Sequence, residues 1–304
     1  MDFYATPFET HMLRDAHTFV GRWSELQLLV NAIDQRRPAV VCAPPRSGRS
    51  SLLFHAVAAG SVLLDIDELP AFYLDMAEFP DLDAVQTTIA EAFAPAGTPW
   101  AQAILRAKSA PLIAFDNIDA PQFRAVRATW MQFLAEEVHA GRLRVIAAAT
   151  SGFVGGGDWV HIPLAPVGQA FLSEYLDVTL PEGPQLSRQD QHFVVAASRG
   201  HLGTMIVVLS LWFRSLTEPD VDWRAVALQH TNALSEEAGT SIPPSTEGAE
   251  GAPGTTGGEH SLPRARAVES VTPTDPSELV GISGWLVLGA FVVMLIVLFW
   301  RAMP

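Results

Sequence analysis

The sequence predicts an α/β protein in which a five-stranded parallel sheet has helices on both faces, followed by a small all-α subdomain, a disordered linker and one transmembrane helix. Three observations lead to this prediction. Short apolar runs alternate with amphipathic stretches in the first half of the chain, as in parallel sheets joined by helices. Beyond Pro166 only helical periodicity is left. Near the C-terminus, 22 consecutive residues carry no charge.

Five apolar runs are expected to form the strands of the sheet. In chain order they are Pro38–Cys42, Ala71–Asp75, Pro111–Asp116, Leu143–Ala149 and Trp159–Pro163. Apolar residues recur at helical spacing in Ser24–Gln35 and Leu82–Phe93, which predicts helices beside the sheet. Residues 61–67 fit either a sixth strand or the early part of the second one, and the pattern leaves both open.

The changes in pattern set the domain boundaries. We expect an N-terminal extension at residues 1–16, the sheet domain at 17–165 and the helical subdomain at 166–234. Helices of the subdomain are expected at Val167–Leu176, Ser187–Ser198, Leu202–Leu216 and Val221–Leu234.

The C-terminal part of the chain predicts a membrane tether. Residues 235–278 are rich in Gly, Pro, Ser, Thr and Glu, which predicts a disordered acidic linker. Residues 279–300 would be about 33 Å long as a helix, enough to cross a bilayer core of about 30 Å, and a short tail of 301–304 follows. Trp285 and Trp300 lie near the two ends, as interfacial aromatics do. Because the N-terminus lacks signal-peptide features, we expect a single-pass C-terminal anchor with the globular domain in the cytoplasm.

Charge and cysteine content exclude several classes of protein. Asp and Glu number 33 against 19 Lys and Arg, and the formal net charge is −14. This is the wrong sign for a protein that holds phosphate backbones along a broad face, so no nucleic-acid partner is expected. Cys42 is the only cysteine, which excludes an internal disulfide and a cysteine-based zinc site.

One segment has the context of a phosphate-binding loop. Val40–Leu53 predicts an apolar strand, a tight loop and a helix. In the pattern G-x-x-x-x-G-K-[ST], backbone N–H groups and a helix N-terminus surround the phosphates, the Lys neutralises them and the hydroxyl holds Mg²⁺. Two of the four fixed positions are changed here, in the run Ala43, Pro44, Pro45, Arg46, Ser47, Gly48, Arg49 and Ser50, with Ser51 following. Taken alone, an ordinary strand-turn-helix is the better interpretation of this loop.

The surroundings of the loop change that interpretation. The box FVGRWSEL lies upstream at residues 19–26, and a strand that ends in Asp116 lies downstream. A further strand ends at Thr150, and the helical part comes next. This order and spacing resemble the AAA+-like P-loop ATPases of the STAND and origin-recognition type over residues 17–217. The resemblance implies a P-loop NTPase fold with a helical lid that binds ATP or ADP together with Mg²⁺.

The resemblance also implies roles for the matching residues. Ser50 and Asp116 would hold Mg²⁺, Thr150 or Ser151 would be the sensor on the fourth strand, and Asn117 would stand at the position of the catalytic acid. The residues near the adenine would be Val20, Gly21 and Arg22, and those around the phosphates would be residues 43–51.

Within the helical part, the run Ser198-Arg199-Gly200-His201 resembles the Gly-His-Pro turn of STAND lids, with Leu202 in place of the proline. An ordinary helix-turn-helix corner explains this run equally well.

Three departures from the pattern predict weak or absent hydrolysis. Arg49 replaces the loop Lys, and a planar guanidinium does not take the place of a compact ammonium. Ala43 replaces the first Gly and adds a Cβ where the backbone turns tightly. Asn117 replaces the acid, and an amide can orient a water molecule but cannot take its proton. For Asp116 and Asp119, solvated acids after a strand remain an alternative interpretation.

Two functions of different kinds remain. The first is a membrane-tethered, nucleotide-responsive switch or assembly factor with slow or no hydrolysis, which acts on an unidentified protein partner and for which a homo-oligomer is one possible assembly. The second is a pseudo-ATPase scaffold that binds no nucleotide and docks a protein partner at the membrane. A fully active ATPase motor is disfavoured by Arg49 and Asn117.

Overall fold

The computed structural model describes residue 8 and residues 19–150, 152–153, 158–218, 220–240 and 266–267. No helix within these ranges is long and apolar enough to cross a membrane. The membrane span expected at residues 279–300, the tail at 301–304 and most of the expected linker lie outside the described residues.

Five parallel strands form the sheet, as the sequence predicts. They are β1 (Ala39–Cys42), β2 (Ala71–Asp75), β3 (Leu112–Asp116), β4 (Arg144–Ala149) and β5 (Val160–Pro163), in the spatial order β5-β1-β4-β3-β2. A two-residue strand, β6 (Arg266–Ala267), pairs antiparallel with β2 and belongs to the segment expected to be the linker. Strand β4 lies between β1 and β3 and is parallel to both. The loops that follow these three strands therefore leave from the same edge of the sheet.

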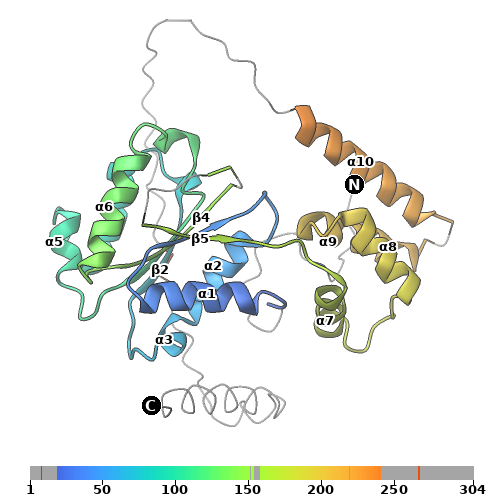
Figure 1. The fold of residues 1–304 in the computed structure, drawn as a ribbon, viewed down its shortest axis with the longest axis horizontal. Coiled ribbons are helices and arrows are strands. Elements are labelled where there is room, and N and C mark those ends of the chain that lie inside the picture. Colours follow the sequence, from blue (N-terminus) through green and yellow to red (C-terminus); the bar gives the residue numbers. More distant parts are fainter. Residues whose placement is uncertain are drawn as a thin grey trace, which may run out of the picture. The chain divides into compact units, whose positions relative to one another are not determined.

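Helices cover both faces of the sheet (Figure 1). One face packs against α1 (Trp23–Asp34) and α2 (Arg49–Ala58). The other packs against α4 (Leu82–Phe93), α5 (Trp100–Ile104) and α6 (Arg127–His139), together with the short 3₁₀ turns η2 (Met76–Glu78) and η3 (Pro121–Phe123). Strand β3 is buried on both sides, because Leu112 and Ala114 join the first core and Ile113 and Phe115 join the second.

The region of residues 61–67, which the sequence left open, is not a strand. A single turn of helix, α3 (Gly60–Leu63), follows α2 and leads into turns. Leu64 and Ile66 then pack against the core formed with α1 and α2, whereas Val62 is 83% exposed. A short apolar run does not by itself distinguish strand from helix, and here contact with a core already formed decides the outcome.

The second half of the described chain is wholly helical. Its helices are α7 (Gln169–Thr179), α8 (Arg188–Ser198), α9 (Leu202–Ser215) and α10 (Trp223–Thr240), the last of which continues beyond the boundary expected at residue 234. Phe8, expected to lie in an N-terminal extension, packs in this helical core with its ring centroid 6.2 Å from that of Tyr175 and 6.0 Å from that of Phe213.

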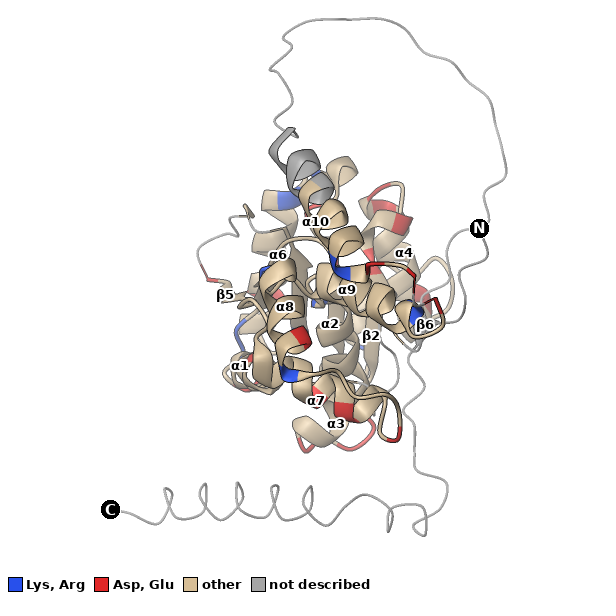
Figure 2. Cartoon of the chain, turned by 90° about the vertical axis from the view of Figure 1, so that its right-hand side faces the viewer, with Lys and Arg blue, Asp and Glu red and all other residues tan. Residues whose placement is uncertain are grey.

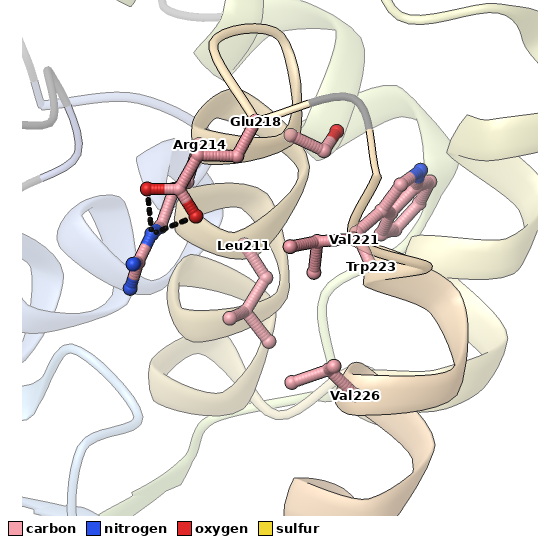
Figure 3. A pocket seen from close by; sticks show the side chains of 7 residues that line it. Leu211, Arg214, Glu218, Val221, Trp223 and Val226 are labelled. Carbon is pink, nitrogen blue, oxygen red and sulfur yellow. Dashed lines mark hydrogen bonds and ion pairs between the residues drawn. The ribbon is translucent and has the colours of Figure 1, made fainter.

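Charged residues are spread over the described elements (Figure 2). Acidic residues gather in loops, as at Asp65, Asp67 and Glu68 after α3. In the helical part, the space between α9 and α10 contains a pocket lined by Leu211, Arg214, Ser215, Glu218, Val221, Trp223 and Val226. Figure 3 shows the Arg214 guanidinium paired with Glu218 at this pocket, with a 3.0 Å contact between them. The other end of α9 is the one that meets the loop between β1 and α2.

Candidate functional site

The loop between β1 and α2 has the shape of an anion cradle. Arg46 and Gly48 both have positive φ, 60° and 92°, and Gly48 begins α2 as its N-cap. The Ser47 hydroxyl donates to the carbonyl of Pro44 at 2.7 Å, which fixes the turn from within. Left-handed residues in such a loop direct successive backbone N–H groups toward one concave side. A glycine is needed at residue 48 because its φ lies far from the range of ordinary side chains.

Several donors of this loop have no acceptor in the part of the chain that the structure describes. Within the described residues, the backbone amides of Arg46, Ser47 and Gly48 make no hydrogen bond. Arg49, the first residue of α2, is only 7% exposed, and no acceptor in the described part of the chain meets its Nη1 atom. A buried cationic donor without a partner is costly, so a site of this kind favours an anionic ligand. The residues present therefore fit a phosphate group.

The segment upstream of the loop, residues 19–26, contains a buried arginine that binds the loop. The Arg22 guanidinium is buried, pairs with Glu25 at 2.8 Å and donates to the carbonyls of Ala165 at 2.8 Å and Ser47 at 3.4 Å. One side chain thus connects the start of α1, the phosphate-binding loop and the segment that leads into α7.

Val20 and Gly21 join the box to the helical subdomain. Val20 is part of the subdomain core, and Gly21 has a φ of 68°. A Cβ at Gly21 would lie 2.2 Å from a ring carbon of Phe171 in α7, so only glycine allows this approach.

The turn before α9 docks directly on the phosphate-binding loop. His201 Nε2 lies 2.7 Å from the carbonyl oxygen of Pro45, and the backbone N–H of Gly203 donates to the carbonyl of Arg46 at 2.8 Å. A Cβ at Gly203 would lie 2.5 Å from the Cβ of Arg46. The run from Ser198 to His201 is therefore a helix-turn-helix corner, and its last residue also contacts the loop between β1 and α2.

Asp116 lies at the carboxyl end of β3, as predicted, and it is almost fully buried. The Tyr73 hydroxyl donates to its Oδ2 atom at 2.5 Å, and the backbone N–H of Asn117 donates to its Oδ1 atom at 2.9 Å. The Ser50 side chain in the first turn of α2 also interacts with Tyr73. The structure thus brings Ser50 and Asp116 together through Tyr73, a residue that the sequence did not indicate. Ser51, beside Ser50, is buried.

The Asn117 side chain hydrogen-bonds to the neighbouring strand β2. It has a φ of 52°, and its Nδ2 atom donates to Asp75 Oδ1 at 2.9 Å. The same carboxylate oxygen accepts the backbone N–H of Ala77 at 3.0 Å. The side chain at the position of the catalytic acid therefore bridges β3 and β2.

Thr150 follows β4, and its partner is Asp119. The backbone N–H of Thr150 donates to Asp119 Oδ2 at 2.9 Å, and its hydroxyl donates to the same oxygen. Asp119 thereby has a structural partner, which the interpretation as a solvated acid did not include. Ser151 lies outside the described residues.

Cys42, at the end of β1, is also close to the loop. Its Sγ atom lies 3.7 Å from His161 Nδ1 on β5. Burial raises the pKa of the thiol, Asp119 raises it further, and Arg49 acts in the opposite direction. A thiol with a raised pKa is a poor nucleophile, so Cys42 fits a structural position beside the loop.

No family model and no curated protein sequence matches the chain. Among solved structures it is similar to the Walker-type ATPase PABY2304 of Pyrococcus abyssi, with a TM-score of 0.50 and 14% identity over 77% of this chain and 77% of that one. It is also similar to the Aeropyrum pernix ORC1 protein, solved in complex with DNA, with a TM-score of 0.47 and 14% identity over 77% and 70% of the two chains. A third similar structure is domain III of the Thermotoga maritima replication initiation protein DnaA, with a TM-score of 0.45 and 14% identity over 76% and 95%.

The similarity to the Pyrococcus abyssi ATPase shows the fold. Together with the five-stranded parallel sheet, the strand-loop-helix at residues 39–58 and the helices on both faces, it shows that this chain has a P-loop NTPase fold.

Proposed function

We propose that this protein binds a nucleoside di- or triphosphate in the loop of residues 43–50 and acts as a nucleotide-responsive switch or assembly factor with slow or no hydrolysis. ATP or ADP is the proposed ligand. Mg²⁺ is the metal ion that usually accompanies such a ligand. The proposal extends the P-loop NTPase fold to a function, and the chemistry of the loop supports it.

The buried Nη1 atom of Arg49, which meets no acceptor among the described residues, is the observation that carries this proposal. Arg49 lies in the first turn of α2, where the helix dipole also favours negative charge. Burial removes its hydration, and the described residues offer its Nη1 atom no acceptor. Phosphate oxygens satisfy a guanidinium with two donors at once, which is a geometry that Arg provides and Lys does not. Arg49 then binds phosphate in a different way from the usual Lys.

Slow or absent hydrolysis follows from Asn117, the residue after β3. Asn117 cannot take a proton from water, and its amide is bonded to Asp75. The site therefore holds a ligand more readily than it activates a water molecule for attack.

The helical lid provides the response. Because His201 and Gly203 bind the carbonyls of Pro45 and Arg46, a change in this loop on phosphate binding must be transmitted to the start of α9.

We further propose that residues 279–300 anchor the protein in a membrane, with the globular domain in the cytoplasm. The lid surface would then present itself to a protein partner or a second copy of the chain, and a tether raises the local concentration for such a partner.

The second candidate is a pseudo-ATPase scaffold that binds no nucleotide and docks a protein partner at the membrane. The capping of Asp116 by Tyr73 favours it, because both carboxylate oxygens already accept a hydrogen bond.

Thermal unfolding of the full chain in detergent micelles, with and without millimolar ATP or ADP, separates the two. A ligand that binds only the native state raises the midpoint, here by about 5 °C at saturation well above Kd. Arg49→Met is the informative variant. It should remove the nucleotide shift while leaving the ligand-free midpoint unchanged or higher, because it deletes an uncompensated buried charge. Arg106→Met, at an exposed arginine, is the matched control and should keep the shift. Absence of any shift in the folded wild-type protein would refute nucleotide binding and support the scaffold.

A further inference from the structure

The Tyr73 hydroxyl lies between the two side chains that hold Mg²⁺ in phosphate-loop NTPases. In those proteins the ion is held by the loop Ser or Thr and by the acid after the neighbouring strand. Here Ser50 and Asp116 occupy these positions. The phenol oxygen lies 2.5 Å from Asp116 Oδ2, to which it donates, and it also interacts with the Ser50 side chain.

The strand pairing and the core hold Tyr73 in this position. Tyr73 is in register with Ala114 of β3, and two residues further on Asp75 is in register with Asp116. Its ring packs against Phe54 of α2, with 6.1 Å between the ring centroids. The phenol is thus supported by both β2 and α2, and its hydroxyl is directed at the end of β3.

The chemistry of the phenol also fits this position. A phenol O–H is a hydrogen-bond donor and a carboxylate oxygen is an acceptor. The Tyr73 hydroxyl donates to the Oδ2 atom of Asp116 at 2.5 Å. It forms a hydrogen bond of the charge-assisted kind, which is stronger than one between neutral groups.

We propose that Tyr73 takes the place of Mg²⁺ in this site, so that nucleotide binds without a requirement for the ion. This inference rests on the proposed nucleotide binding and concerns its metal dependence. A hydroxyl carries no positive charge, so neutralisation of the phosphates falls to Arg49 and the free amides of the loop. Asp116, with a hydrogen bond at each oxygen, acts as a structural acceptor.

Equilibrium binding of ATP to the full chain in detergent, measured by calorimetry in EDTA and in millimolar Mg²⁺, tests this proposal. We expect the Kd of the wild-type protein to differ by less than about twofold between the two conditions. Tyr73→Phe keeps the ring and removes the hydroxyl, and it should bind ATP at least about tenfold more tightly with Mg²⁺ than with EDTA. Adding Asp116→Asn to Tyr73→Phe should abolish this gain, because the ion loses its carboxylate.

The outcomes are distinguishable. If wild-type binding depends on Mg²⁺ as strongly as that of Tyr73→Phe, or if Tyr73→Phe shows no gain with Mg²⁺, the inference about Tyr73 is wrong while nucleotide binding stands. If neither protein binds ATP in either condition, the proposed function is wrong and the inference falls with it.

Discussion

His201 Nε2 lies 2.7 Å from the carbonyl oxygen of Pro45, so the turn before α9 is hydrogen-bonded to the loop between β1 and α2. Since a carbonyl only accepts, Nε2 carries the proton in this contact, and Nδ1 is left to accept the backbone N–H of Thr204 at 3.3 Å. The same imidazole therefore caps α9 and holds the loop. Any rearrangement of the loop strains this helix cap, which links the candidate site to the lid.

Replacing His201 with Ala should loosen the lid. The change removes an N-cap and the hydrogen bond to Pro45, with an expected loss of about 1–3 kcal/mol in the free energy of unfolding. Denaturant unfolding measures the loss, and hydrogen exchange should accelerate at the start of α9. His192→Ala, at an exposed position of α8, is the control and should change little. Equal losses in the two variants would contradict the bond between loop and lid.

Close packing at Gly203 leads to a second prediction. Gly203→Ala places a Cβ about 2.5 Å from the Cβ of Arg46, so the lid must move away from the loop, at an expected cost of about 1–3 kcal/mol. Gly168→Ala is the matched change, because nothing lies within 4 Å of a Cβ there. Thermal midpoints compare the two. If Gly203→Ala gains stability through its higher helix propensity, the loop and α9 are not in tight contact.

The Tyr73 and Asp116 side chains should be energetically coupled. A double-mutant cycle of Tyr73→Phe and Asp116→Asn should give a coupling of about 1.5–3 kcal/mol, as expected for a buried hydrogen bond to a charged group. Denaturant unfolding of the four proteins provides the values. Tyr73→Phe with Asp75→Asn is a suitable comparison, since no hydrogen bond joins these two side chains in the described structure. A coupling near zero for Tyr73 and Asp116 would contradict the contact.

The buried ion pair of Arg22 and Glu25 predicts a dependence of stability on pH. Burial raises the pKa of Glu25, but hydrogen bonds from Ser24 and Arg22 outweigh this and hold the pKa below its usual value. A lowered pKa in the folded state contributes stability above the unfolded pKa, and this contribution is lost as the pH falls through the folded value.

Arg22→Gln should therefore lower the free energy of unfolding at neutral pH by about 3 kcal/mol, because it leaves Glu25 buried without its cation. Its stability should then rise on acidification toward pH ~4, where the carboxylate is protonated, whereas the wild-type stability falls. Measuring the free energy of unfolding of both proteins across this pH range gives the comparison. The double variant Arg22→Gln/Glu25→Gln is the control, because it has no ion pair and should lack the pH dependence that the pair causes. If the stability of wild type and of Arg22→Gln changed with pH in the same way, the ion pair would not be the source of the pH dependence.

Much of the fold could be predicted from the sequence because it depends on local periodicity. The five strands lie within one residue of the expected ranges, and the helices of the lid begin close to theirs. The long α6 was not assigned, although Trp130, Leu134 and Val138 mark its buried face at helical spacing. Residues 61–67 stayed undecided for a physical reason, since their conformation depends on contact with α1 and α2.

The sequence by itself determined the position of the loop between β1 and α2, the arginine at residue 49 where the loop pattern has Lys, and the acid at the end of β3. These are properties of single residues and of their order along the chain. Only the tertiary structure decided that Tyr73 would join Ser50 to Asp116, that Asn117 would bond to Asp75 and that His201 would hold Pro45. Each of these contacts joins residues far apart in the sequence. They form because strand order and helix packing bring those residues together, and no local pattern encodes that arrangement.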